Sequence, residues 1–314
     1  MRVIVTGGAG FIGSHLSLSL LELGHEVICI DNFFTSRKET ISNLTSFSNF
    51  ELMRHDVCDP WHIEADQIYH LACPASPVHY QKNPVRTIKT AMIGTLNALE
   101  CARDTNARLV ITSTSEVYGD PIIHPQSEDY FGNVNPIGDR SCYDEGKRVG
   151  ESLAVSWSKQ YKTDVRIARL FNTYGPHMAF NDGRLIPNFI LQAIKGNPLT
   201  VYGDGSQTRS FCYVSDTVRG LIKLMNVDQS DKVPVINIGN PDERTILSVA
   251  NDIIKSINTS LRTVHEPLPS DDPKQRCPDI TKAKLLLDWE PVVSYEEGIS
   301  KTVKWFTSEF RSRK

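Results

Sequence analysis

Tyr143 and Lys147 are the residues whose types and spacing point most directly to chemistry. They stand four positions apart in a predicted helix, so both side chains lie on one face of that helix, about one turn apart. A lysine ammonium beside a phenol favours the phenolate. We therefore expect Lys147 to lower the pKa of Tyr143 and to make it a base that works near neutral pH. The alternative is a solvated pair, and the neighbouring motifs decide between the two.

A turn rich in hydroxyl groups, residues 113–119, directly follows a predicted strand at 109–112. In a parallel sheet, the loop at the carboxyl end of a strand borders the ligand crevice. Thr114 and Ser115 could pass a proton to the tyrosine or hold a substrate hydroxyl, and Glu116 adds a carboxylate to the same turn. The alternative is a Ser/Thr-rich turn in which Glu116 caps the next segment.

Three glycines, Gly7, Gly10 and Gly13, lie between a predicted strand and a predicted helix with the spacing of a phosphate-binding turn. Glycine lets the strand turn sharply into the helix and lets the backbone approach a pyrophosphate, which the first N–H groups of the helix then face. Asp31 ends the next predicted strand, where a carboxylate can accept hydrogen bonds from ribose hydroxyls and would repel a 2′-phosphate. This context favours NAD over NADP as cofactor. The alternative is that the glycines serve tight helix–strand packing and Asp31 is a cap.

The elements that must position these residues alternate between short β-branched runs and longer helical patterns. This alternation predicts an α/β fold, a Rossmann-type doubly wound parallel sheet. We expect an NAD-binding domain over 1–172 and a smaller, irregular α/β lobe that binds the substrate over 173–314, with the chain crossing back to the sheet. The expected strands are 3–5, 26–30, 51–53, 67–71, 108–112 and 164–170, and the expected helices are 11–23, 85–103, 143–161, 215–225, 245–257 and 295–310.

Composition excludes several classes of protein. The 314 residues carry 34 basic and 37 acidic side chains, a net charge of −3, which argues against a broad nucleic-acid-binding surface. Seven cysteines without a C-x-x-C pair argue against a disulfide framework and for a reducing compartment, and nine histidines without ligand spacing predict no metal site. We see no membrane-spanning or signal segment and expect a soluble, cytoplasmic protein with no membrane or nucleic-acid partner.

Together these motifs resemble the extended short-chain dehydrogenase/reductase superfamily, and within it the UDP-glucuronate decarboxylases. The closer resemblance runs from residue 2 to at least residue 291. It is carried by segments 70–77 (HLACPASP), 113–121 (STSEVYGDP), 133–138 (NVNPIG), 142–148 (CYDEGKR) and 205–211 (GSQTRSF). One departure is Cys73, where the family pattern leads us to expect serine.

The resemblance implies that bound NAD oxidises the sugar at C4, that the resulting β-keto acid loses CO2, and that C4 is reduced again to give UDP-xylose. Tyr143 would be the base for the C4 hydroxyl, Lys147 would hold the nicotinamide ribose, and Thr114 would bridge to the C4 oxygen. Ser115 and Glu116 would lie near the departing carboxylate and C5. We also hypothesise that the charge of Glu116 destabilises the substrate carboxylate and so assists CO2 loss.

The resemblance also implies the binding residues. Those for NAD are Gly7, Gly10, Phe11, Ile12, Gly13, Asp31, Asn32, Phe33, Thr35, Asp56, Val57, Leu71, Thr90, Tyr143, Lys147 and Thr173. Those for the UDP-sugar acid are Lys89, Asn172, Arg184, Arg209 and Arg276, and Arg276 is also a predicted catalytic residue. Arginine suits a diphosphate and a carboxylate because its planar fork binds them through two N–H groups. For Arg184, a surface ion pair is an equal alternative. Relatives imply a homodimer formed through helices 83–104 and 143–161.

Rival functions share the fold. One is a decarboxylase that releases the UDP-4-keto-pentose, and another is a UDP-glucuronate 4-epimerase. A 4,6-dehydratase is disfavoured because its family carries an Asp-Glu pair where Ser115 and Glu116 stand here. A different class is a non-catalytic NAD-sensing protein, which predicts damage to the Tyr-x-x-x-Lys pair or the hydroxyl turn, and both are intact.

Overall fold

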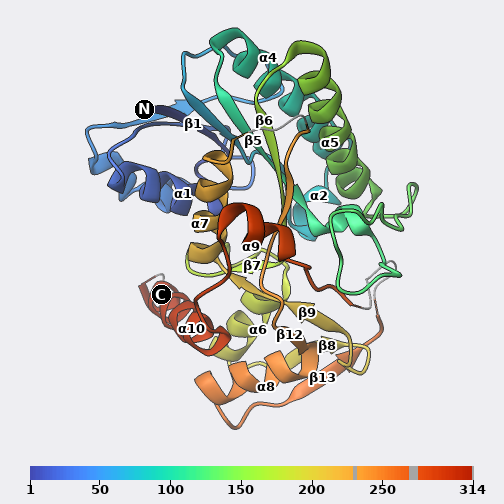
Figure 1. Ribbon diagram of the computed structural model, residues 1–314. Coiled ribbons are helices and arrows are strands. Elements are labelled where there is room, and N and C mark those ends of the chain that lie inside the picture. The colour runs from blue at the N-terminus through green and yellow to red at the C-terminus, as the bar shows by residue number, and fades with distance from the viewer. Residues whose placement is uncertain (229–231, 269–274, 313–314) are drawn as a thin grey trace.

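A seven-stranded parallel sheet with helices on both faces forms the centre of the computed structural model, which describes residues 1–228, 232–268 and 275–312 (Figure 1). The strands lie side by side in the order β11-β6-β5-β4-β1-β2-β3. Their bounds are β1 (Arg2–Thr6), β2 (Glu26–Asp31), β3 (Phe50–Arg54), β4 (Gln67–His70), β5 (Arg108–Thr114), β6 (Val165–Leu170) and β11 (Val235–Ile238). The predicted Rossmann-type doubly wound fold is confirmed.

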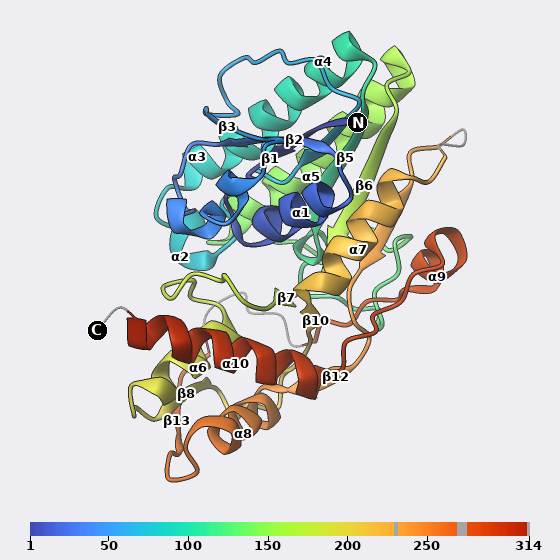
Figure 2. The same ribbon diagram turned by 90° about the vertical axis from the view of Figure 1, so that its left-hand side faces the viewer.

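Alternate residues of each strand face two separate cores. Val3 and Val5 pack on one face of the sheet, and Ile4 packs on the other. The helices α1 (Phe11–Glu22) and α7 (Val214–Met225) cover the first face, and α4 (Thr95–Thr105) and α5 (Ser141–Tyr161) cover the second (Figure 2). Burial on both faces explains why the strands read as continuous apolar runs in the sequence.

The helix expected at 85–103 is the one element of the first half that differs from expectation. It is divided into α3 (Pro84–Lys89), a π-helical turn (Thr90–Gly94) and α4. The apolar pattern of the sequence could not reveal this turn. The extra residue in a π turn rotates the helix that follows, but it leaves the composition of the segment unchanged. The π turn places Thr90 on the wall of the cavity described below, and such turns often lie at functional sites.

The chain beyond residue 172 contributes to both layers of the molecule. Helix α7 packs on the sheet and β11 pairs with β6 as its edge strand. A smaller lobe lies below the carboxyl edge of the sheet in Figure 1. It contains α6 (Leu185–Ile194), α8 (Ile246–Ile257), α10 (Tyr295–Ser312) and the strand pairs β8 (Leu199–Tyr202) with β13 (Thr263–Glu266) and β9 (Thr208–Ser210) with β12 (Glu243–Thr245). Shorter elements are α2 (Pro77–Tyr80), β7 (Thr173–Tyr174), β10 (Cys212–Tyr213) and α9 (Thr281–Leu287). The division of the chain at residue 172 stays a prediction.

All seven cysteines are unpaired thiols, and none of the helices in the described part of the chain is both long and apolar enough to cross a bilayer.

Candidate active site

A cavity of about 1100 Å³ lies between the carboxyl edge of the sheet and the smaller lobe. The sheet side contributes the glycine turn, the loops after β2 and β4, and the hydroxyl turn after β5; the other side contributes segments 170–192 and 200–211 and Arg276. Single-ligand sites usually measure roughly 300–1,000 Å³. The cavity lies just above that range, which fits a ligand as large as a dinucleotide.

The glycine turn leaves no room for side chains where a dinucleotide would approach. A Cβ on Gly13 would lie 2.2 Å from the carbonyl oxygen of Gly7. Gly7 itself has a φ of +68°, and its Cβ would lie 2.9 Å from the backbone of Ala72. Gly10 precedes α1 and has no side chain to cap it, so the first N–H groups of that helix stay available to an anion. The turn therefore fits a pyrophosphate.

Asp31 stands at the end of β2, on the wall of the cavity. Burial raises the pKa of its carboxyl group, and hydrogen bonds from the Phe33 amide, the Ser36 hydroxyl and the Ala9 amide lower it. These three donors lie 2.8, 2.8 and 3.1 Å from the carboxylate oxygens. A carboxylate has about four acceptor positions, so one remains for a ribose hydroxyl.

Tyr143, the predicted base, is buried in the cavity wall near the start of α5. Burial raises the pKa of its phenol well above the ordinary value, while a hydrogen bond with Thr114 and the charge of Arg184 lower it. The Nζ of Lys147 donates a hydrogen bond of 2.8 Å to the carbonyl oxygen of Thr112. Desolvation of the phenol outweighs the groups that lower its pKa in this structure, and the expectation that Lys147 lowers that pKa stays a prediction. Thr114 is the residue that hydrogen-bonds with the phenol.

Glu116 is held between two arginines that come from different parts of the chain. Both terminal nitrogens of Arg276 donate to the two oxygens of Glu116, and Nη2 of Arg140 lies 2.7 Å from Oε2. Burial alone would raise the pKa of Glu116, but the charges of Arg276 and Arg140 hold it at about 2. In this structure the two arginines compensate the negative charge of Glu116, and the hypothesis that this charge assists CO2 loss stays a prediction.

Asp144 is an acidic group of this cluster that the sequence analysis missed. It is only 6% exposed, and burial together with the charge of Glu116 raises its pKa to about 7. Arg140, which stands at the N-terminal end of α5, was missed as well. The only sequence feature that could have identified Arg140 and Asp144 was their position near Tyr143. Charged residues in a helix, however, normally indicate a face exposed to solvent.

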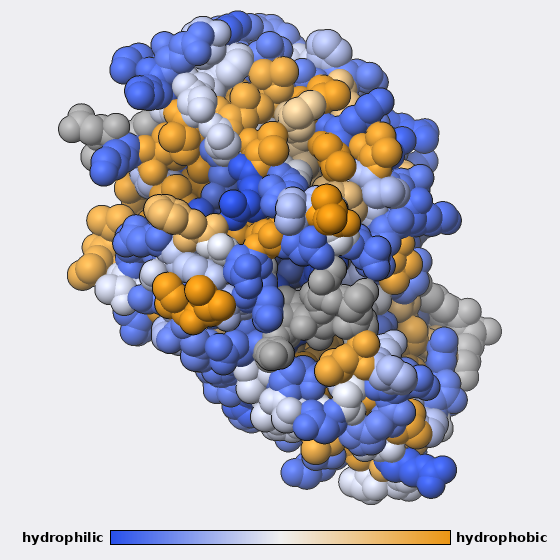
Figure 3. Space-filling model, turned by 90° about the vertical axis from the view of Figure 1, so that its right-hand side faces the viewer, coloured by the Kyte–Doolittle hydropathy of each residue, from blue (hydrophilic) through white to orange (hydrophobic). Residues whose placement is uncertain are grey.

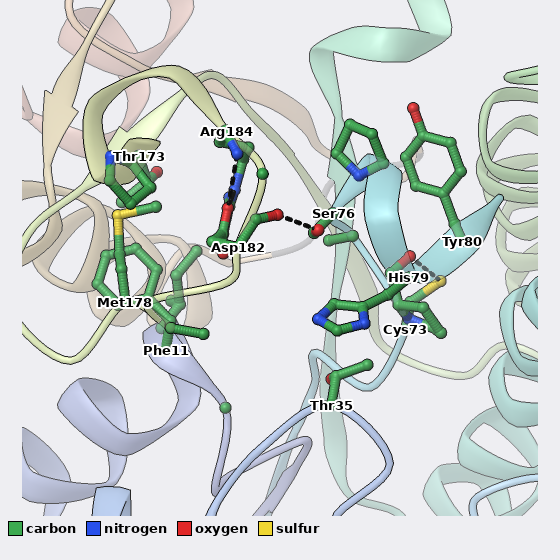
Figure 4. Close-up of a pocket in the computed structure, with 18 of the residues that line it drawn as sticks. Phe11, Thr35, Cys73, Ser76, His79, Tyr80, Thr173, Met178, Asp182 and Arg184 are labelled. Carbon is green, nitrogen blue, oxygen red and sulfur yellow. Dashed lines mark hydrogen bonds and ion pairs between the residues drawn. The ribbon is translucent and has the colours of Figure 1, made fainter. Parts of the chain in front are cut away.

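Arg184 and Asp182 form a second paired site on the opposite wall of the cavity (Figure 4). The Nη2 of Arg184 lies 2.7 Å from Oδ2 of Asp182, and its Nε also donates to that carboxylate. Ser76, from the loop after β4, donates to the carbonyl oxygen of Asp182 and so joins the two sides of the cavity. Arg184 is thus both a cavity residue and a member of an ion pair.

The structure brings most predicted site residues together on one cavity. The lining contains Gly7, Gly10, Phe11, Ile12, Gly13, Asp31, Asn32, Thr35, Val57, Leu71, Thr90, Thr114, Ser115, Glu116, Tyr143, Lys147, Asn172, Thr173, Arg184, Arg209 and Arg276. Phe33, Asp56 and Lys89 are not part of it. Lys89 is exposed on α3, and Asp56 pairs with Arg86. The individual binding roles stay predictions.

One group of metal-binding residue types lies outside the cavity. The ligand atoms of His124, Glu243 and Cys277 all lie within 4.8 Å of one another. His124 and Glu243 already form a pair at 3.0 Å, and the thiol of Cys277 donates to the carbonyl of Pro241. The expectation of no metal site rested on spacing along the chain, which cannot detect residues that meet only after folding.

Comparisons with known proteins agree with this geometry. The family model described as GDP-mannose 4,6 dehydratase matches residues 4–302. The chain is 57% identical over 309 residues to UDP-glucuronic acid decarboxylase 1 of Danio rerio, covering 98% of this chain and 73% of that protein. It is 56% identical over 313 residues to UDP-glucuronic acid decarboxylase 1 of Arabidopsis thaliana, covering 100% and 70%.

Solved structures with the same architecture include two epimerases. UDP-glucose 4-epimerase of Thermotoga maritima, solved with UDP-glucose, has a TM-score of 0.89 and 28% identity and covers 99% of this chain and 100% of its own. UDP-glucuronic acid 4-epimerase of Bacillus cereus, in complex with UDP-glucuronic acid and NAD, has a TM-score of 0.89 and 29% identity and covers 98% and 100%.

Proposed function

The chain belongs to the UDP-glucuronic acid decarboxylases of the extended short-chain dehydrogenase/reductase family, and we propose that it converts UDP-glucuronate to UDP-xylose and CO2 with bound NAD. It is a carboxy-lyase. The observation that carries the assignment is the 55–57% identity with decarboxylases over nearly the whole chain, against 28–30% with the epimerases of the same fold. An epimerase is therefore not favoured.

The glycine turn and Asp31 would hold the cofactor, the turn at its pyrophosphate and Asp31 at its adenosine ribose. Lys147 would hold the ribose on the nicotinamide side. Bound there, NAD would supply reversible hydride transfer at the sugar C4. The fit rests on the absence of space for a Cβ at Gly13 and on the free acceptor position at Asp31.

Tyr143 and Thr114 would bind the C4 oxygen and move its proton. Their side chains form a hydrogen bond, so a proton taken from the sugar hydroxyl can pass between them. Once C4 is a ketone, the sugar is a β-keto acid with its carboxylate at C6. The electron pair of the C5–C6 bond, left behind when CO2 departs, passes to the same C4 oxygen. Asn172 and Arg209 would hold the diphosphate of the substrate. Arg276 would leave Glu116 and bind the substrate carboxylate in its place.

One experiment tests this function. Purified protein is incubated with UDP-glucuronate and NAD, the CO2 released is measured, and the sugar is identified by NMR. UDP-xylose together with CO2 is the expected result. Release of UDP-4-keto-pentose would favour the decarboxylase that stops before re-reduction, and UDP-galacturonate without CO2 would favour an epimerase. A protein that binds NAD but leaves UDP-glucuronate unchanged would contradict enzymatic function altogether.

We also propose that the protein is a homodimer joined through α3, the π turn, α4 and α5. Val85, Ile88 and Met92 are exposed at spacings that place them on one helical stripe, and Val149 is exposed on the adjacent α5. Figure 3 views the side of the molecule that carries α5, and apolar side chains gather over its upper part. Two such helix faces can complete a four-helix bundle with the same faces of a second copy.

Val149→Glu is expected to convert the dimer to a monomer, because it places a charge in the apolar contact. Light scattering coupled to size-exclusion chromatography measures the mass of the particle. Val292→Glu, a change at an exposed valine away from these helices, is the control and should remain dimeric. A wild-type protein that elutes as a monomer would contradict the proposal.

The seven free cysteines support our proposal that the protein works in a reducing compartment such as the cytoplasm.

A further inference from the structure

A small second chamber lies behind Glu116. It has a volume of about 60 Å³, and its walls include Glu116, Arg140 and Asp144 together with polar residues of the 119–138 segment. Glu116 and Arg140 also line the large cavity. The ion pair between them, 2.7 Å at its shortest, is therefore the partition between the two spaces. The chamber is large enough for water and polar enough to hold it.

Asp144 borders this chamber, and one of its two carboxyl oxygens, Oδ1, is buried without a partner in the described part of the chain. Among the described residues, none forms a hydrogen bond with its Oδ1, although the side chain is almost fully buried. A buried carboxyl oxygen without a partner is unfavourable unless water or a proton satisfies it. Because Oδ1 is closed to water, the arrangement favours a protonated Asp144 whose side chain borders the chamber.

The charges around Asp144 determine where a proton resides in the cluster. Glu116 faces it from the turn after β5, Arg140 from the start of α5 and Arg276 from the segment before α9, while Glu145 is its neighbour on α5. The side chains of Tyr80, on α2, and Cys142 are also close enough to interact with its charge. Burial and Glu116 raise the pKa of Asp144 to about 7, whereas the two arginines keep Glu116 ionised.

Decarboxylation consumes one proton in each turnover. The bond between C5 and C6 breaks, CO2 leaves, its electron pair passes through C5 to the C4 oxygen, and a proton then adds to C5. An ionised Glu116 has no proton to give. When Arg276 moves to the substrate carboxylate, however, Glu116 loses one of its two cations and its proton affinity rises.

We propose that Asp144 and the water of the chamber form the proton supply for C5, with Glu116 as the link between the chamber and the sugar. Asp144 gives its proton to the chamber water, the water protonates Glu116, and Glu116 gives the proton to C5. Asp144 is left as a carboxylate and regains a proton from solvent before the next turnover. Because Asp144 acts through Glu116, it is a positioning residue, and its role rests on the proposed decarboxylase function.

Asp144→Asn tests the proposal, since it preserves shape and removes the exchangeable proton. In single-turnover experiments, we measure CO2 release and the appearance of the UDP-pentose as separate rates across pH 5.5–8.5. For the wild type, the rate of UDP-pentose formation should fall as the pH rises past the pKa of Asp144. In Asp144→Asn, CO2 release should stay within about 3-fold of wild type while UDP-pentose formation drops about 10²-fold and loses that pH dependence.

Two further variants keep the test decisive. Asp144→Glu retains a titratable carboxyl group and should recover part of the lost rate and its pH dependence. Glu145→Gln removes a neighbouring carboxylate on the same helix and should keep both rates within about 3-fold of wild type, since its charge is the smallest of the named influences on Asp144. Equal loss of both rates in Asp144→Asn, or no loss of either, would overturn the proton-supply role. A wild-type protein that releases no CO2 would instead overturn the proposed function itself.

Discussion

Replacing Tyr143 with phenylalanine is expected to lower the turnover number for UDP-glucuronate about 10³-fold, within the range of about 10²–10⁴ that a positioned acid–base group contributes. The change removes the only phenol that hydrogen-bonds with Thr114 among the described residues. It leaves the glycine turn and Asp31 untouched, so we expect the fold to be unchanged and the affinity for NAD to fall far less than the turnover number.

Steady-state CO2 release measures the loss, and calorimetric titration with NAD measures the affinity. Tyr80→Phe is the matched control, because the rings of Tyr80 and Tyr143 stack at 5.2 Å with only 4° between their planes. The Tyr80 hydroxyl is buried without a partner, so its removal should leave turnover intact and stability equal or higher. If Tyr143→Phe were as active as wild type, Tyr143 would have no part in the proton transfer at C4.

Glu116→Gln is expected to have the second large effect, because it leaves Arg140 and Arg276 without their shared counter-ion. Arg276 is only 3% exposed. Removing one partner of a buried pair costs about 3–5 kcal/mol of stability. We further expect steady-state CO2 release to fall about 10²-fold, since the variant loses the proposed proton link to C5 and each turnover must protonate C5 before the next can begin. Urea unfolding and CO2 release measure the two effects separately.

The double variant Glu116→Gln/Arg140→Gln separates stability from catalysis. It removes one of the two uncompensated charges, so part of the stability should return while CO2 release stays low. Stability that is additive over the two changes would contradict the coupling seen in the structure.

The pH dependence of stability gives a further readout of Glu116→Gln. The pKa of Glu116 is about 2 in the folded protein and lies in the ordinary range, near 4.5, when unfolded. Its stabilising contribution is therefore complete above the unfolded value and is lost as the pH falls toward 2. The variant should lack this acid-dependent loss.

The fold and much of the cavity wall could be predicted from the sequence because their determinants are local. Gly13 and Asp31 follow from the needs of a single strand–turn–helix unit, and Tyr143 and Lys147 follow from one turn of helix. Because the sheet is buried on both faces, each strand can be recognised in the sequence as a run of apolar residues. The π turn at Thr90–Gly94 was not predictable, since one inserted residue leaves the apolar pattern almost unchanged.

The sequence alone thus determined the sheet, the glycine turn and the prediction of Tyr143 as the base, each through residues a few positions apart. Only the tertiary structure decided which charges compensate one another. Arg276 and Glu116 are 160 residues apart in the chain, and the pKa of Asp144 is raised only when Asp144 itself is buried with the charge of Glu116 beside it. Coulomb energies depend on distance and desolvation in the folded protein, and spacing along the chain specifies neither of them.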